Sequence, residues 1–157
     1  MPTTDEDRVL ESLDEAECRR LLTTTAIGRL GFTEDALPAI VPVSFTLHDG
    51  RVLIPARQGS SVVNAVRGSV VAFEVDSYDA ATGTGTGWSV TVVGPARLVS
   101  VPENVADFEE LRSSARPSAR ERCSIAVQLG LLRGWRISRI PTASAGPLDG
   151  AGTSPGR

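Results

Sequence analysis

Hydrophobic and polar residues alternate with a period of two along several short segments of this chain. In segment 41–48, Val41, Val43, Phe45 and Leu47 alternate with polar residues or proline. Successive side chains of a β-strand point to opposite faces, so this pattern predicts a strand with one buried face. Strands are predicted in the same way over residues 26–32, 39–47, 51–56, 69–76, 88–99 and 135–140.

Turn-forming residues separate or bend these predicted strands. Asp49-Gly50 follows segment 39–47 and predicts a tight hairpin, because glycine readily adopts the positive φ that such turns need. Residues 35–38 predict a second turn. Gly94-Pro95 lies inside the long segment 88–99 and predicts a bend, because proline and glycine interrupt regular pairing.

Three short helices are predicted between the strands. Ser12 followed by Glu15 fits a capping box at the start of the first helix. Val105, Phe108 and Leu111 share one face of the last helix at helical spacing. The predicted helices cover residues 13–22, 61–67 and 102–114.

These elements predict a mainly β protein, a closed antiparallel barrel of six or more strands with short helices. The chain has 157 residues, which fits one domain. We expect a mobile arm over residues 1–11, the barrel over 12–140 and a disordered tail rich in Pro and Gly over 141–157. Residues 116–132 fit either a helix or a buried strand.

Composition narrows the classes of partner and chemistry. The net charge of −3 and pI of about 5.2 argue against a nucleic-acid partner. No stretch is apolar enough for a signal core or a membrane span, which predicts a cytoplasmic location. All 16 basic residues are arginines, which excludes chemistry through a lysine Schiff base. Cys18 and Cys123 have no metal-type spacing, so we expect two reduced thiols and no metal.

One short segment has the chemistry of a phosphate seat. Arg57 precedes Gly59, Ser60 and Ser61 at the start of a predicted helix. A guanidinium pairs with phosphate in a fork geometry, and free N–H groups at a helix start also accept anions. Ser60 fits equally well as a plain helix N-cap. A phosphate seat at the end of a small barrel would suggest a nucleotide-like cofactor.

Two further patterns concern surfaces. Glu74 and Asp76 lie two residues apart on one strand face, where they can pair with arginines. Residues 70–75 and 90–93 are apolar beyond plain alternation, so both faces of these strands are expected to be covered. A second copy of the chain would provide the outer cover, which predicts a homodimer.

The chain resembles the pyridoxamine 5′-phosphate oxidase-like proteins of the FMN-binding split β-barrel superfamily. The resemblance spans about residues 12–140, and its most specific part is GWSV followed by V-x-G-x-A-R after AFEVD. The matching segments, in the order of the family, are AIGRLGF (26–32), AIVPVSFTLHDGRVLIPARQGSSV (39–62), VVAFEVDSYD (70–79), GWSVTVVGPARLV (87–99) and WRISRI (135–140).

The resemblance implies an FMN-dependent oxidoreductase of unknown small-molecule substrate, with flavin bound at a homodimer interface. It implies three groups of cofactor-binding residues: a strand beside the flavin ring, a turn around the ribityl phosphate, and a strand that faces the flavin across the dimer. These groups are, in order, Val43, Ser44 and Phe45; Ala56, Arg57, Ser60 and Ser61; and Trp88 and Ser89. No catalytic side chain is implied.

Two alternatives remain open beside FMN. Family members often carry lysine where this chain has Ser61, so one phosphate cation is missing and Arg57 carries more weight. A deazaflavin-dependent reductase would need a groove lined with arginine, for which Arg112, Arg116, Arg120 and Arg122 are available. A non-enzymatic protein that binds flavin or haem is the other alternative. The constellation that binds pyridoxamine phosphate has no clear match.

Overall fold

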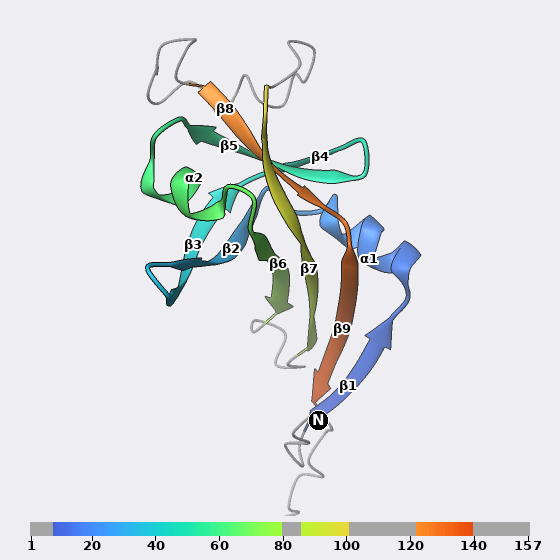
Figure 1. Cartoon of the computed structure of the whole chain (residues 1–157). Helices are drawn as coiled ribbons and strands as arrows, with labels where there is room; N and C mark the ends of the chain where they lie inside the picture. The colour runs from blue at the N-terminus through green and yellow to red at the C-terminus, as the bar shows by residue number, and fades with distance from the viewer. Residues whose placement is uncertain (1–7, 80–85, 101–121, 140–157) are drawn as a thin grey trace, which may run out of the picture.

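The computed structural model describes residues 8–79, 86–100 and 122–139, which form antiparallel strands and two short helices (Figure 1). The prediction of a mainly antiparallel β fold with few helices is confirmed, with nine strands in these ranges. The predicted helix over 102–114 and the predicted tail over 141–157 lie outside the described residues. The elements are β1 (Arg8–Leu13), α1 (Glu15–Leu22), β2 (Ile27–Glu34), β3 (Leu37–Ser44), β4 (Thr46–His48), β5 (Arg51–Arg57), α2 (Ser61–Val66), β6 (Val70–Asp79), β7 (Thr86–Val99), β8 (Arg122–Gln128) and β9 (Leu131–Arg139).

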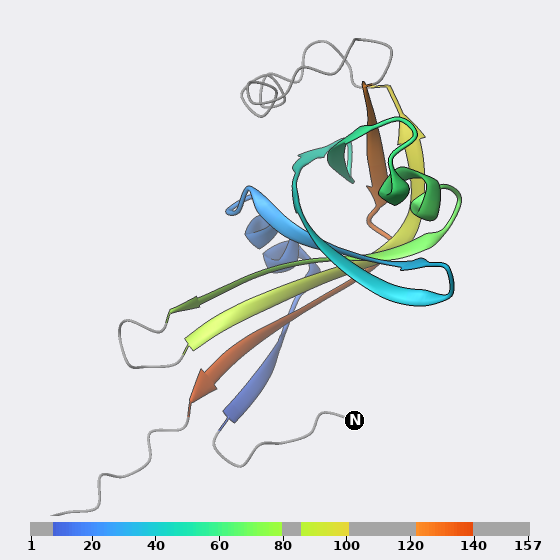
Figure 2. The same ribbon diagram turned by 90° about the vertical axis from the view of Figure 1, so that its left-hand side faces the viewer.

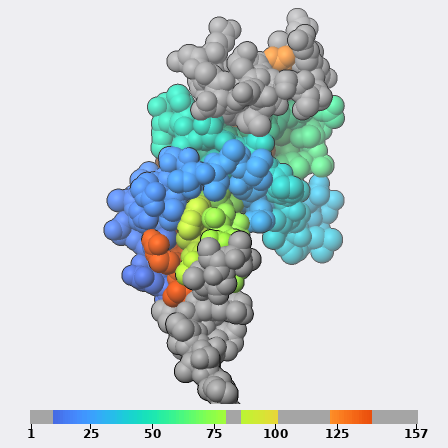
Figure 3. Space-filling view, turned by 180° about the vertical axis from the view of Figure 1, so that it is seen from behind, coloured from blue at the N-terminus to red at the C-terminus, as the bar shows by residue number. Residues whose placement is uncertain are grey.

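The strands form two connected sheets that share β7. The long sheet has the order β3-β2-β6-β7-β9-β1, and the short sheet has the order β7-β8-β5-β4. Strands β6, β7, β9 and β1 extend together beyond the barrel (Figure 2). Seen from behind, α1 and β1 border one side of the molecule and the β2–β3 hairpin forms the other side (Figure 3).

Strand β7 bends where it passes from one sheet to the other, as the Gly94-Pro95 pair predicted. It pairs with β9 over Gly87–Val93 and with β8 over Ala96–Val99. A side chain at Gly94 would collide with the backbone oxygen of Gln128, at the end of β8. The two chain segments can therefore approach this closely only because Gly94 has no Cβ.

Both predicted hairpin turns are present. Asp35 and Ala36 have φ values of 48° and 64°, and Asp49 and Gly50 have values of 50° and 68°. Positive φ at both central residues is typical of the two-residue turns that match the twist of antiparallel strands. The first turn joins β2 to β3, and the second joins β4 to β5.

The single strand predicted over residues 39–47 is wrong in one respect, because Phe45 divides it. The Phe45 side chain is buried, and its ring packs edge-on against Phe73 with centroids 4.7 Å apart. Its backbone N–H donates to the Ala26 oxygen over 3.2 Å. Burial of the ring turns the chain inward, so β3 ends in the long sheet and β4 begins in the short sheet.

The predicted start of α1 is wrong by two residues. Asp14, rather than Ser12, caps the helix, and its carboxylate accepts a hydrogen bond from the Glu17 backbone N–H over 2.8 Å. Ser12 instead lies in β1, opposite Trp135 of β9. Residues 8–11, expected within a mobile arm, belong to the same paired strand, and residues 1–7 lie outside the described ranges.

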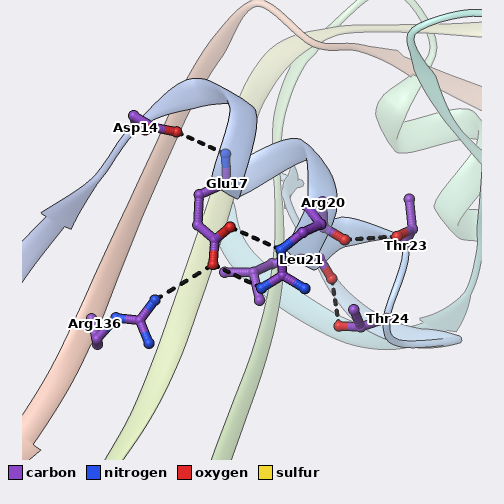
Figure 4. Close-up of polar contacts among 7 residues, drawn as sticks. All are labelled: Asp14, Glu17, Arg20, Leu21, Thr23, Thr24 and Arg136. Carbon is purple, nitrogen blue, oxygen red and sulfur yellow. Dashed lines mark hydrogen bonds and ion pairs between the residues drawn. The ribbon is translucent and has the colours of Figure 1, made fainter.

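Glu17 ties α1 to β9 (Figure 4). Its carboxylate accepts hydrogen bonds from the Arg20 guanidinium at 2.7 and 2.8 Å and from Arg136 of β9 at 3.4 Å. The hydrogen bond from Arg20 lowers the pKa of the Glu17 carboxyl, and the nearby charges of Arg20 and Arg136 act in the same direction. This network therefore holds the helix against the sheet with charge-assisted contacts.

One hydrophobic core fills the barrel. It is built from the inward residues of both sheets and from the buried sides of the two helices. Helix α1 packs on β9 and β7, and α2 packs on β2 and β7. The largest fully buried side chains include Leu22 of α1, Leu30 of β2, Phe73 of β6 and Ile125 of β8. Burial of such side chains contributes about 1.5–3 kcal/mol each to folding.

The described part of the ambiguous segment 116–132, which starts at residue 122, contains the buried strand β8 and no helix, and residues 116–121 lie outside the described ranges. Residues Cys123–Val127 of β8 are all buried, which explains why this stretch lacks the alternation of a half-exposed strand. Strand β9 then begins at Leu131, four residues before the predicted start at 135. Cys18 and Cys123 are both free and buried, and burial raises the pKa of each thiol.

Adding a methyl group at Gly134 should destabilise the fold. A Cβ at this position would collide with Cys18 Sγ of α1 and with Leu13. We expect Gly134→Ala to lower the free energy of unfolding by about 1–3 kcal/mol, as overpacked cores do. Urea unfolding would measure this loss. The control is Gly31→Ala, whose Cβ would lie 3.6 Å from the Ala72 side chain, an ordinary contact; equal stability of the two variants would contradict the predicted clash.

The Glu17 network should make stability depend on pH in the acid range. Because the folded-state pKa of Glu17 is lowered, its contribution is present above the unfolded pKa of about 4.3 and is lost as the pH falls through the folded value. We expect Glu17→Gln to flatten the loss of Tm on acidification below about pH 5. Glu15→Gln is the control, since in the part of the chain that the structure describes Glu15 pairs with Arg19 of the same helix and with no other residue. An unchanged acid profile in Glu17→Gln would exclude this role.

Candidate functional site

The predicted phosphate seat lies where β5 ends and α2 begins. Gly59 has a φ of 77°, which allows the tight turn between Arg57 and the helix. The Ser60 N–H donates to the Arg57 oxygen over 3.2 Å. Ser60 also caps α2, because its Oγ accepts a hydrogen bond from the Val63 N–H over 3.4 Å. The hydroxyl of Ser60 is thus engaged in the helix cap, whereas Ser61 is exposed.

Arginines gather at this end of the short sheet. Arg57 is exposed and has no ion-pair partner among the described residues. Its direct partner in the β5–β8 register is Arg122, so the side chains of two arginines extend from backbone positions that lie opposite each other on neighbouring strands. Arg67 lies near Cys123, whose thiol pKa is raised by burial and held down in part by the charge of Arg67. Arginines at these positions concentrate positive charge at this end of the sheet, where an anion would be attracted.

The structure separates the three residues of the predicted ring strand between two faces of the long sheet. The Val43 side chain packs at the edge of the core and that of Phe45 is inside it, while Ser44 points the other way and is half-buried. Only Ser44 can therefore use its side chain on the outer face. Strands β3 and β5 approach each other, which brings this strand near the one that leads to Arg57. Ala56 of β5 faces the core.

Trp88 and Ser89 of β7 also face opposite sides of the long sheet. The Trp88 side chain packs against the margin of the core. Ser89 Oγ donates to Glu74 Oε1 of β6 over 2.9 Å. Ser89 thus belongs to a polar network on the outer face, together with Glu74.

Arg29 of β2 completes that network. Its guanidinium contacts Glu74 at 3.0 Å and Asp76 at 2.8 Å, so the predicted pairing of the two carboxylates with an arginine is confirmed. The hydrogen bonds that Arg29 donates to Asp76 and Glu74 raise the pKa of Arg29 further above its ordinary range. These pairs lie at the surface, where each contributes little to stability, but together they order the polar side chains across two strands.

Ser44 and Ser89 do not meet within one chain. They lie on the outer faces of β3 and β7, and two strands, β2 and β6, separate them. Three strand spacings correspond to about 14 Å. A ligand that touches both strands in the predicted way would therefore need Ser89 from a second copy.

The outer face of the long sheet carries exposed apolar side chains around the Arg29 network. Ile40 of β3 and Val70 of β6 are 71% and 68% exposed. Exposed apolar residues of the other strands of this sheet are Leu10, Ile27, Leu131 and Trp135. Large apolar patches of this kind are typical of interaction surfaces. Residues 70–75 were expected to be covered on both faces. Within the described part of a single chain, nothing packs on their outer face.

The displaced pKa values have structural explanations. In the ranges that the structure describes, they belong to Glu17, Arg20 and Arg29 in ion pairs and to Cys18 and Cys123 in the core. These residues contain no group of three or more potential metal ligands. No described helix is long and apolar enough to cross a membrane. The arrangement favours binding of an anionic ligand over proton transfer by a side chain.

Arg122 is the residue whose position the sequence did not reveal. It was one of four arginines available for a basic groove, with no indication of where it lies. The β5–β8 register places it opposite Arg57, 65 positions away in the chain. The sequence signal that could have located Arg122 is a buried strand that begins after residue 121. The residues of that stretch fit a helix as well, so the signal was ambiguous.

Relatives of known structure share this architecture. The structure of the FAD binding protein from Mycobacterium smegmatis matches with a TM-score of 0.61 and 29% identity, over 82% of this chain and 98% of that chain. A FAD-binding protein from Mesorhizobium loti has a TM-score of 0.65 over 82% of this chain and 98% of that chain. At 18% identity, the second likeness shows the fold alone.

Sequence comparison defines the family. An uncharacterised protein of Mycobacterium tuberculosis is 45% identical over 142 residues, which are 85% of this chain and 91% of that protein. The profile of the pyridoxamine 5′-phosphate oxidase family matches residues 14–129, from the cap of α1 to the end of β8. The chain therefore belongs to the pyridoxamine 5′-phosphate oxidase family and has the split-barrel fold of its flavin-binding relatives.

Proposed function

We propose that this protein binds FMN at the interface of a homodimer and acts as a flavin-dependent oxidoreductase on a small molecule in the cytoplasm. The observation that carries the proposal is Arg57, which has no ion-pair partner in the described residues and lies beside the Gly59–Ser61 turn. Family membership and the 29% identity to a FAD binding protein support a flavin as the anion. The substrate and the electron donor are not part of the proposal.

The donor set at the turn fits a phosphate. Arg57 offers a planar guanidinium fork, and the exposed Ser61 offers a hydroxyl at the start of α2. Arg122 starts from the position opposite Arg57 and brings a second positive charge to the same end of the sheet. Because the chain has no lysine, these arginines replace the lysine that related proteins often use after the loop serine.

The flavin ring would lie along the outer side of β3. Ser44 and the backbone of β3 would bind it from one protomer, and Ser89 of β7 would approach from the partner copy, with Trp88 supporting β7 from the core side. Val43, Phe45 and Ala56 would support these strands from the core side. The flavin supplies the redox chemistry when bound, and the protein binds it, orients it and excludes water from one ring face.

The homodimer follows from the apolar outer face of the long sheet. Ile40, Val70 and their exposed neighbours surround the Arg29 network. A second copy would remove these side chains from water at about 25 cal/mol per Å² of apolar area, and the ion pairs at the centre would define its orientation.

Removing the Arg57 charge should weaken flavin binding. A charge-assisted contact contributes about 1.5–3 kcal/mol, so we expect Arg57→Ala to raise the Kd for FMN roughly tenfold to a hundredfold. Arg57→Lys should recover only part of the affinity, because the fork is lost. Quenching of flavin fluorescence during titration would measure each Kd, with parallel titrations of FAD.

The matched control for Arg57 is Arg19→Ala, which removes an exposed arginine of α1. Its Kd should equal that of the wild type. A Kd for FAD far below that for FMN would assign FAD as the natural flavin while retaining the phosphate seat. Equal affinity of all variants for both flavins would refute this seat, and no binding to the wild type would refute a flavin-dependent function.

The dimer should depend on the apolar outer face. Light scattering should give twice the chain mass of 16.5 kDa for the wild type. We expect Ile40→Asp to produce a monomer, because the carboxylate would lie among apolar side chains. Ala16→Asp, on the exposed side of α1, is the control and should remain dimeric. A monomeric wild type at micromolar concentration would eliminate the interface site.

A further inference from the structure

The ion network on the outer face of the long sheet uses only part of its hydrogen-bonding capacity. Arg29 contacts Glu74 and Asp76 through one nitrogen, Nη1, at 3.0 and 2.8 Å. A guanidinium has five N–H donors, so those on Nε and Nη2 remain for other acceptors. Asp76 accepts through Oδ1, and its second oxygen has no hydrogen bond to another described residue. The network therefore offers both donors and acceptors to a covering surface.

This network is open to solvent in a single chain, and its surroundings are flat. The side chains of Arg29 and Asp76 are 53% and 46% exposed. Next to them on the same face, Gly31 and Ala72 are direct partners in the β2–β6 register. Neither residue projects a large side chain. The strip along β2 and β6 thus combines paired charges with space for the close approach of another sheet.

The proposed flavin site restricts how a second copy can lie on this strip. In the proposed homodimer, Ser44 of one copy and Ser89 of the other bind the same flavin. Two-fold symmetry requires the reverse contact as well, from Ser89 of the first copy to Ser44 of the second. Because the two sheets face each other, the symmetry axis lies between them and parallel to both. An axis that exchanges β3 with β7 then runs along the strands, midway between them, above the boundary of β2 and β6.

We propose, on the basis of the proposed function, that the two-fold axis of the homodimer runs along the β2–β6 boundary and that Arg29 of each copy pairs with the carboxylates of the other. This axis places β2 of one copy over β6 of the second. Arg29 and Glu74 are direct partners in the β2–β6 register, so each Arg29 lies over Glu74 and Asp76 of the opposing chain. The free donors of one network meet the free oxygen of the other, and the same contact is made twice.

Such an interface is self-complementary, as a symmetric dimer requires. Gly31 of one copy lies over Ala72 of the other, which leaves room for the two backbones to approach. Burial of charges is costly unless they are paired, and the contacts across the axis give each Arg29 acceptors from two chains. Ion pairs of this kind define orientation, whereas the exposed apolar residues Ile40 and Val70 supply area for affinity.

An exchange of charges between two variants tests the pairing. Arg29→Glu leaves only carboxylates at the axis. Glu74→Gln combined with Asp76→Arg leaves only guanidinium groups, and the new amide oxygen can still accept from Ser89. Each variant alone should dimerise at least about tenfold more weakly than the wild type, because like charges meet across the axis. An equimolar mixture should form the heterodimer, which native mass spectrometry distinguishes by the different masses of the two chains.

The matched control exchanges the charges of an exposed pair on α1. Arg19→Glu and Glu15→Arg should each remain dimeric and should mix without preference. If the wild type is a dimer but the two axis variants show no preference for each other, the position of the axis is wrong and the homodimer stands. A monomeric wild type would overturn both the axis and the homodimer of the proposed function.

A second measurement leaves the charges unchanged. Across this axis, position 31 lies one strand spacing, about 5 Å, to the side of its own copy, and the sheets are about 10 Å apart. Gly31→Cys should therefore cross-link two chains through a short bis-maleimide, seen as a doubled mass on a denaturing gel. Val93→Cys lies in the same row on β7, about 14 Å to the side of its copy, and should not.

The wild-type chain controls for reaction of the buried Cys18 and Cys123. A dimeric Gly31→Cys protein that gives no cross-link, or equal cross-linking of the two variants, would overturn the position of the axis.

Discussion

The close approach of β7 to the end of β8 is the constraint on which the rest of the structure depends. At Gly94, strand β7 leaves β9 as its partner and takes up β8, and there is no room for a side chain beside the Gln128 oxygen. Strands β8 and β9 run consecutively along one edge of β7, interrupted at Leu129-Gly130. One bend therefore divides a continuous ladder into two sheets and closes the barrel around the core.

Division of the ladder also decides where binding chemistry can occur. The short sheet brings Arg57 and Arg122 to its end, next to the start of α2. The long sheet places Ser44 and the network of Arg29 and Glu74 on a surface that the described residues leave open. In the proposed function, the cofactor would lie between these two regions, with its anionic end at the first and its flat ring at the second, and another chain would supply the second wall.

Stability and binding thus use different parts of the same strands. Inward residues such as Phe73 and Val92 are completely buried and tolerate little change in volume. Outward residues of the same strands, such as Glu74 and Ser89, form polar contacts at the surface. The alternation of a β-strand makes this separation possible, because each second residue can change without altering the core.

Local structure and fold class could be predicted from the order of the residues alone. Period-two alternation, the Asp49-Gly50 turn and the Gly94-Pro95 bend act through the backbone of neighbouring residues, so they could be interpreted without tertiary contacts. AFEVD with the following GWSV and V-x-G-x-A-R carried the most specific signal for the family, and segment 57–61 was enough to select Arg57 and Ser60 as candidates.

Which distant residues meet could not be predicted in this way, because it depends on how the strands pair in space. The division of one strand at Phe45, the pairing of β1 with β9 and the position of Arg122 opposite Arg57 all depend on strand register. Register is set by burial of side chains from the whole chain, and a shift of one residue would reverse every face. That non-local selection explains why Asp14 replaced Ser12 as the cap and why Ser44 and Ser89 lie apart.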